Sequence, residues 1–142
     1  MLTTIVITKN EQEMIGDCLQ SLQFADEIIV IDNGSTDSTN HIAQKMGAKI
    51  IKSQSTSFSG ARNDGLAAAM GDWILYVDAD ERVSPELQLE IKSIMADKSS
   101  PAAYDIPRRN FYLGREMHYG GWGNDSVIRL FQKKNLGNCK LP

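Results

Sequence analysis

Residues 73–81 read WILYVDADE, an apolar run that ends abruptly in acidic residues. A continuous apolar run such as Trp73–Val77 is typical of a strand buried on both faces of a parallel sheet. The run is followed at once by Asp78, Asp80 and Glu81. These carboxylates are therefore predicted to lie where a central strand leaves the sheet.

Strand and helix patterns alternate around this stretch. The segment Glu27–Asp32 (EIIVID) is a second continuous apolar strand, and Leu2–Thr8 is a third that is rich in β-branched residues. Alternation of this kind predicts βαβ units with right-handed crossovers, and hence an α/β fold around a mostly parallel sheet. The other predicted elements are helices at Glu11–Leu22, Ser59–Met70 and 84–96, a helix capped by Ser35 and Thr36 that runs to about Met46, and strands at Ala48–Lys52, Ala103–Pro107 and Ser126–Phe131.

Polar residues follow three of these strands directly. In parallel sheets, ligands bind outside the carboxyl ends of the strands. Three polar clusters are therefore predicted to converge on one edge of the sheet and to form a binding site there. The clusters are Thr8–Glu11, 32–34 (Asp-Asn-Gly) and Asp78–Glu81.

The spacing of Asp78 and Asp80 suggests a cation partner, because two carboxylates so close together repel each other. Hard oxygen ligands suit Mg²⁺ or Mn²⁺, which usually sit between one or two carboxylates and substrate phosphates. The sequence holds no GxxxxGK[ST] loop and no GxGxxG after its first strand, which disfavours a P-loop enzyme and a dinucleotide-binding fold. On spacing alone, a solvated turn remains the alternative.

The composition of the 142 residues is that of one globular domain, with 42% apolar and 23% charged residues and a net charge of −3. Residues 1–100 carry eight Lys and Arg against fifteen Asp and Glu, whereas residues 101–142 carry seven against three. The basic segment is either a solvated tail or a surface for phosphates or anionic lipid. Negative net charge and the absence of interleaved aromatic residues exclude a nucleic-acid module. The N-terminus lacks the pattern of a secretory signal, and two cysteines without metal or disulfide spacing predict a cytoplasmic protein.

Four segments resemble the family-2 glycosyltransferases in sequence and in order: IVITKNEQEMIGDCLQSL, DEIIVIDNGSTDST, FSGARNDGLAAAMGDWILYVDADE and GWGNDSVIRLF. Together they cover most of residues 4–131, and the closest likeness is to bacterial enzymes of lipopolysaccharide-core or surface-glycan synthesis. The resemblance implies the GT-A fold, a Rossmann-like three-layer α/β/α arrangement. It also implies inverting transfer from a nucleotide-diphosphate sugar, here a UDP-sugar, to a glycan or lipid-linked acceptor with the help of Mg²⁺ or Mn²⁺.

The resemblance also assigns roles to residues near the donor. Thr8 would lie against the base and ribose, Asp32 would accept a hydrogen bond from the uracil N–H, and Arg62 would contact the nucleotide. The plainer alternatives are a strand end for Thr8, a turn for Asp32 and a surface ion pair with Asp64 or Asp72 for Arg62. The nucleotide-binding set implied in this way is Thr8, Asn10, Glu11, Asp32, Arg62 and Asp78.

For the chemical step, the resemblance makes Asp80 the direct metal ligand, bridging to the diphosphate, and places Asp78 on the ribose or a metal-bound water. The metal would then offset the charge of the leaving nucleoside diphosphate. Asp125 is nominated as the general base that deprotonates the acceptor, although the family's usual Glu-Asp pair reads Asn-Asp here. Weaker candidates for the general base are Glu116 and His118. Trp122 is either a platform on which the acceptor sugar stacks or a buried aromatic residue. Arg129 would hold the pyrophosphate or pair with an acidic residue.

Members of this family usually extend well beyond residue 142. Residues 1–100 are therefore predicted to form the nucleotide-sugar-binding half, and residues 101–142 the start of an acceptor-binding half of the same domain. Two other functions stay open. One is a non-catalytic nucleotide-binding module. The other is a phosphatase with an aspartate nucleophile, because ILYVDADERV resembles hhhhDxDx[TV], although Arg82 stands where Thr or Val is expected.

Overall fold

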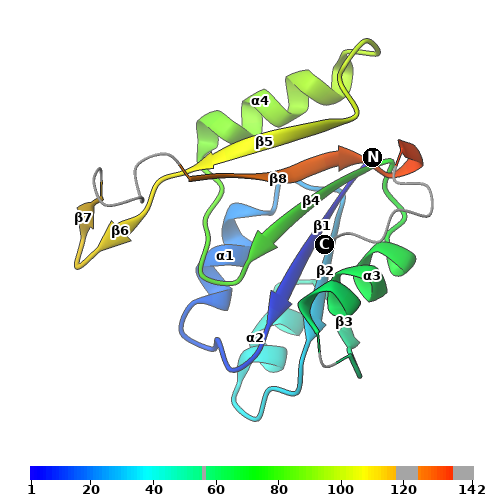
Figure 1. Cartoon of the computed structure of the whole chain (residues 1–142). Coiled ribbons are helices and arrows are strands. Elements are labelled where there is room, and N and C mark those ends of the chain that lie inside the picture. The colour runs from blue at the N-terminus through cyan, green and yellow to red at the C-terminus, as the bar shows by residue number, and fades with distance from the viewer. Residues whose placement is uncertain (56, 118–124, 136–142) are drawn as a thin grey trace.

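A computed structural model describes residues 1–55, 57–117 and 125–135. It contains a six-stranded sheet in the order β3-β2-β1-β4-β8-β5 (Figure 1). β3, β2, β1 and β4 are parallel, β8 is antiparallel to β4, and β5 is antiparallel to β8. The sheet is thus mostly parallel, as predicted. Its strands are β1 (Leu2–Thr8), β2 (Glu27–Asp32), β3 (Lys49–Lys52), β4 (Trp73–Asp78), β5 (Ala103–Arg108) and β8 (Asp125–Gln132).

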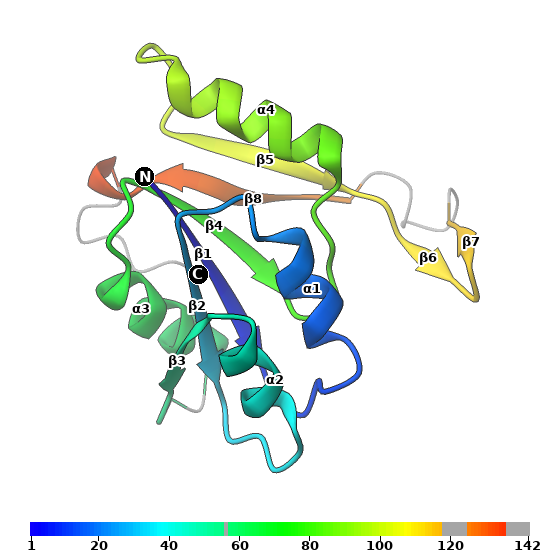
Figure 2. The same cartoon turned by 180° about the vertical axis from the view of Figure 1, so that it is seen from behind.

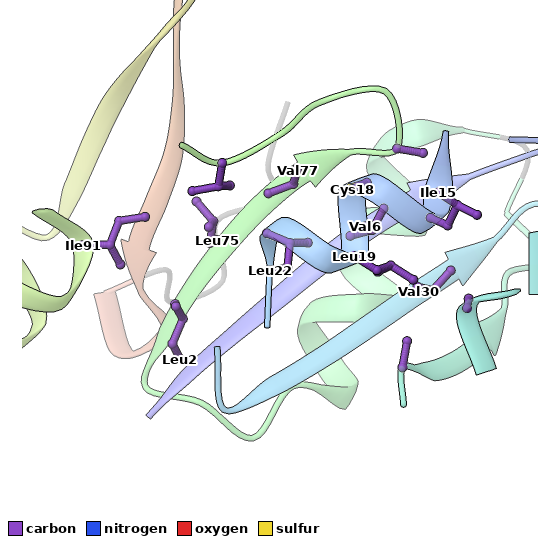
Figure 3. Close-up of a cluster of buried hydrophobic side chains, with 14 of the residues drawn as sticks. Leu2, Val6, Ile15, Cys18, Leu19, Leu22, Val30, Leu75, Val77 and Ile91 are labelled. Atoms are coloured by element: carbon purple, nitrogen blue, oxygen red, sulfur yellow. The ribbon is translucent and has the colours of Figure 1, made fainter. Parts of the chain in front are cut away.

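Helices cover both faces of this sheet and complete three layers. α3 (Phe58–Ala68) lies on one face, and α1 (Ile15–Ser21), α2 (Thr39–Lys45) and α4 (Pro85–Ala96) lie on the other (Figures 1 and 2). Alternate residues of each central strand enter the two cores, since successive side chains of a strand point to opposite faces. Val6, Val30 and Val77 pack under α1 with Leu19 and Cys18 (Figure 3). Cys18 is fully buried in this core.

The opposite core lies between the sheet and α3. It is built from the alternate residues of the same strands, among them Ile5, Ile31 and Tyr76, with Ala61 from the helix. Gly65 of α3 approaches the sheet so closely that an added Cβ would lie 2.7 Å from Ile5 Cγ2. The helix therefore depends on a glycine at this position for its close contact with the sheet.

We expect Gly65→Ala to destabilise the fold although alanine favours a helix. The methyl group has to displace a side chain in a close-packed core, which costs about 1–3 kcal/mol, and the gain in helix propensity offsets only about 1 kcal/mol of it. Gly16→Ala in α1 is the matched control, because its nearest neighbour would be Ile42 Cγ2 at 3.7 Å. Urea unfolding should show a loss for Gly65→Ala and no loss for Gly16→Ala. Equal free energies of unfolding for Gly65→Ala and the parent would contradict the close contact.

The structure corrects one predicted helix start and adds one element. α2 begins at Thr39, and its N-cap residue Ser38 makes no side-chain capping bond, so Ser35 and Thr36 do not cap this helix. Ser84 caps α4, accepting from Leu87 N, and Pro85 lies in the first turn, so this helix fills the predicted range 84–96. A small hairpin of β6 (Phe111–Tyr112) and β7 (Arg115–Glu116) was not predicted, and it projects from the sheet (Figures 1 and 2).

Within the described ranges, none of the helices has the length and apolar character needed to cross a membrane. The longest of them, α4, has 12 residues, whereas a spanning helix needs about 20.

Candidate functional site

The carboxyl ends of β1, β2 and β4 are neighbours in the sheet. Thr8 at the end of β1 pairs with Asp32 at the end of β2, and Ile7 pairs with Asp78 at the end of β4. The backbone N–H of Asn33 extends the β1–β2 ladder by donating to the Thr8 carbonyl at 3.0 Å. The three polar clusters therefore meet at one edge of the sheet, as the strand order requires.

Asp32 is held in one orientation by two hydrogen bonds. The Ser35 backbone N–H donates to Oδ1 at 2.9 Å, and the Asn40 side-chain amide donates to Oδ2 at 2.8 Å. Burial, at 2% exposure, acts to raise the pKa of Asp32, but the hydrogen bonds from Ser35 and Asn40 outweigh it and lower the pKa below its ordinary value. Asp32 is thus an oriented carboxylate that is ionised at neutral pH, with lone pairs left to accept a further hydrogen bond.

Three residues next to Asp32 in the sheet, in the sequence or by hydrogen bond carry polar atoms without partners. Thr8 Oγ1, Asn33 Oδ1 and Asn40 Oδ1 are buried and make no hydrogen bond within the part of the chain that the structure describes. Leaving a buried polar atom unpaired costs about 1–3 kcal/mol, so such atoms usually serve a ligand or an ordered water. This group at the β1 and β2 ends is suited to a polar ligand such as a nucleobase.

The loops after β1 and β2 are tied to each other. Asn10 has a left-handed backbone (φ 56°), which asparagine tolerates better than most residues. Its backbone N–H donates to Ser35 Oγ at 2.9 Å, and its Oδ1 accepts from Thr36 N at 2.8 Å. The Glu11 N–H donates to Thr39 Oγ1 at 2.9 Å. The residues expected to cap a helix therefore join the two loops, and Asn10 shapes the loop that carries Thr8.

The acidic stretch after β4 forms a tight turn. The Glu81 N–H donates to the Asp78 carbonyl at 2.9 Å, and Glu81 Oε2 accepts from the Asp78 N–H at 2.8 Å. Arg129 of β8 places Nη2 2.6 Å from Asp78 Oδ2 and 3.0 Å from Glu81 Oε1. Burial acts to raise the pKa of Asp78, but the hydrogen bond and charge of Arg129 lower it. Glu81, predicted to lie at the sheet edge with Asp78 and Asp80, is held within this turn.

Asp80 stands apart from this network. It is exposed and forms no ion pair with any described residue. No group of three or more His, Cys, Asp and Glu side chains within the described ranges could enclose a metal ion. The donor set fits an ion held by one carboxylate and completed by phosphate oxygens and water, which is a common arrangement for Mg²⁺. Asp78 is already engaged by Arg129, so it suits an indirect role.

Arg62 lies on α3, on the same side of the sheet as Asp78. Its guanidinium carbon is 5.7 Å from the centre of the Tyr76 ring, and the Tyr76 hydroxyl donates to the Arg62 carbonyl at 3.1 Å. Its charge contributes to lowering the pKa of Asp78. The alternative ion pairs do not form, because Asp64 accepts from Ser53 Oγ and Asp72 contacts the N-terminal amine. Arg62 is thus placed beside the site.

The residues nominated for the acceptor side are less fully described. Asp125 begins β8, where its backbone pairs with Arg108, and its side chain lies outside the described part. His118 and Trp122 also lie outside the described residues. Glu116 receives two hydrogen bonds from Arg109, at 2.8 and 2.6 Å, which favours a structural role for this carboxylate.

Residues 3–138 match the protein family described as Glycosyl transferase family 2. The chain belongs to this family. An uncharacterized glycosyltransferase of Rickettsia typhi is 38% identical over 136 residues, which are 94% of this chain and 47% of the relative. The lipopolysaccharide core biosynthesis glycosyltransferase LpsC of Rhizobium meliloti is 25% identical over 118 residues, 80% of this chain and 44% of the relative. The chain thus spans about half the length of the curated relatives it matches.

Solved structures share the fold. S. aureus TarS 1–349 in complex with UDP has a TM-score of 0.55 and 30% identity, over 67% of this chain and 32% of that chain. Glucosyl-3-phosphoglycerate synthase from Mycobacterium tuberculosis, in complex with Mn²⁺, UDP-glucose and phosphoglyceric acid, has a TM-score of 0.51 and 26% identity, over 58% and 35%. The three-layer α/β/α arrangement of this glycosyltransferase domain is therefore the GT-A type of Rossmann-like fold.

Proposed function

We propose that this domain binds a UDP-sugar and a divalent metal at the carboxyl edge of its sheet. In the whole protein, it would transfer the sugar with inversion to a glycan or lipid-linked acceptor in cell-envelope polysaccharide synthesis. The observation that carries the donor site is the strand register, which pairs Thr8 with Asp32 on one side of β1 and Ile7 with Asp78 on the other. Support for the donor and metal comes from the UDP and Mn²⁺ complexes of the structural neighbours, and support for the pathway comes from LpsC.

Each part of the donor has a partner of suitable chemistry. The unpaired atoms around Asp32 suit the base, and the Asp32 carboxylate itself suits the uracil N–H. Arg62 supplies positive charge near Asp78. Asp80 would hold Mg²⁺ or Mn²⁺ against the diphosphate, where the ion stabilises the charge of the leaving nucleoside diphosphate. Asp78 would face the ribose or a water on the ion.

The acceptor side is proposed from the chain after residue 100. Asp125 would take the proton of the attacking hydroxyl, which an inverting displacement requires. The excess of basic residues in this segment would favour contact of the domain with an anionic membrane on its cytoplasmic side, where a lipid-linked acceptor would be reached. Residues 101–142 would then form the beginning of the acceptor-binding half.

The proposed function is tested by titrating the 142-residue chain with UDP, GDP and ADP in Mn²⁺ and in EDTA by calorimetry. We expect UDP to bind more tightly than the purine nucleotides and more tightly in Mn²⁺ than in EDTA. No binding of any nucleotide would refute the donor site. UDP binding without sugar transfer from UDP-sugars to lipid-linked acceptors would instead point to a non-catalytic nucleotide-binding module.

A further inference from the structure

The three carboxylates at the end of β4 and in the following turn differ in whether they form an ion pair with an arginine. Asp78 and Glu81 share the Nη2 atom of Arg129, at 2.6 and 3.0 Å. Glu81 Oε1 also lies 3.5 Å from Arg108 Nη1. Asp80 is exposed and forms no ion pair with a described residue. Two carboxylates of the turn are thus neutralised by arginine before any ligand arrives, and one is left open.

Arg129 is the residue that joins β8 to this turn. It is 5% exposed, and it reaches the turn from the strand beside β4. Its Nε and Nη1 atoms are buried and have no hydrogen-bond partner in the described part of the chain. A buried guanidinium with unpaired N–H groups contributes little to the stability of a fold, since an apolar side chain of similar volume often stabilises it equally well. A role toward a ligand explains its presence better.

The charge of the turn explains that role. Three carboxylates in four residues would repel a diphosphate, and in partly buried surroundings such repulsion is much stronger than in water. The same three carboxylates, if all were unpaired, would attract a divalent cation without any nucleotide. Pairing two of them with one arginine changes both tendencies at once.

We propose that Arg129 is the positioning residue of this turn. By holding Asp78 and Glu81 it leaves Asp80 as the single carboxylate for the metal, and it makes the turn accept the diphosphate. The inference rests on the proposed function, because it assumes that the anionic part of the donor lies beside Asp80. When the arginine is removed, the affinity for UDP should fall and the affinity for Mn²⁺ should rise. A general loss of structure would lower both affinities.

The experiment compares Arg129→Gln with Arg109→Gln in the 142-residue chain. Arg109 is the matched control, because it also pairs with a carboxylate, Glu116, but lies outside the turn. For Arg129→Gln we expect UDP affinity in EDTA to fall about tenfold or more, because Asp78 and Glu81 lose the positive charge that offsets their repulsion of the diphosphate. Affinity for Mn²⁺ alone should rise about threefold or more, because Asp78 loses its arginine partner while Glu81 keeps only the longer contact with Arg108. Uridine binding and both affinities of Arg109→Gln should stay near the parent values.

Arg129→Lys guards against a variant that fails to fold. Lysine keeps the positive charge but offers one nitrogen, so UDP affinity should fall less than in Arg129→Gln, while Mn²⁺ affinity still rises. Parallel losses of UDP, uridine and Mn²⁺ binding, or parent values for UDP and Mn²⁺, would overturn the role of Arg129. If the parent bound no UDP, the proposed function would fail, whereas the Mn²⁺ titration would still decide whether Arg129 restrains the turn.

Discussion

Replacing Asp80 with alanine is expected to remove the metal dependence of UDP binding. Asp80 is the one carboxylate of the turn that is exposed and outside the arginine network. Without it, an ion between the turn and the diphosphate has no protein carboxylate free to hold it. We expect the UDP affinity in Mn²⁺ to fall to that in EDTA, a loss of about 100-fold if the ion contributes roughly 3 kcal/mol.

Asp72→Ala is the control for this variant. Asp72 is an exposed aspartate at the opposite end of β4, where it contacts the N-terminal amine at 3.4 Å. The variant removes the same charge from the loop that precedes β4 instead of the turn that follows it, so UDP binding in Mn²⁺ should remain at the parent level. Calorimetry in Mn²⁺ and in EDTA measures both variants. Tight, Mn²⁺-dependent UDP binding by Asp80→Ala would show that the metal is held elsewhere.

Replacing Asp32 with alanine is expected to erase the preference for uracil. The carboxylate is fixed by Ser35 and Asn40, and its lowered pKa keeps it ionised at neutral pH, so it can accept a hydrogen bond from the uracil N–H. A hydrogen bond to a charged group is worth about 1.5–3 kcal/mol, which corresponds to about 10- to 100-fold in affinity. UDP affinity should fall by this factor, and GDP affinity should change much less.

Two further variants make this comparison specific. Asn40→Ala removes one hydrogen bond that orients Asp32 but keeps the carboxylate, so the uridine preference should weaken without being lost. Asp26→Ala removes a carboxylate from the other end of β2, where it accepts from Leu2 N at 2.7 Å, and should leave the ratio of UDP to GDP affinity unchanged. Equal losses for UDP and GDP in Asp32→Ala would mean that Asp32 does not read the base.

The parts of the fold that could be predicted are those with strong local patterns. The apolar runs ending at Thr8, Asp32 and Asp78 set three strands, and the rule for parallel sheets placed their ends together. The Ser84-Pro85 start of α4 was predictable because its capping pattern is local. The family resemblance supplied the further expectation of a GT-A fold, which the family match and the solved structures confirm.

The remaining features depend on contacts between distant segments or on unusual turn residues. Asn40 holds Asp32, although helical periodicity does not mark it as part of a site. Arg129 was expected to hold the pyrophosphate or pair with an acid; it pairs with Asp78, but a partner 51 residues away could not be identified from local pattern. Ser35 was predicted to cap a helix because a serine hydroxyl can accept from a backbone N–H. In the structure it accepts from the backbone N–H of Asn10 in the other loop instead. The β6–β7 hairpin turns at Leu113-Gly114, both with positive φ, where Asn-Gly is the usual signal. Asp125 as general base stays a prediction.

The position of β8 in the sheet affects how the chain folds during synthesis. A strand synthesised after residue 124 inserts between β4 and β5, so a ribosome that has released only the first hundred residues presents β4 as a bare edge. Arg129 then reaches Asp78 only after this long-range closure, which is slow compared with local folding. The ability to bind the nucleotide should therefore appear late in folding. A chain truncated after residue 100 should aggregate and should not bind the nucleotide by itself.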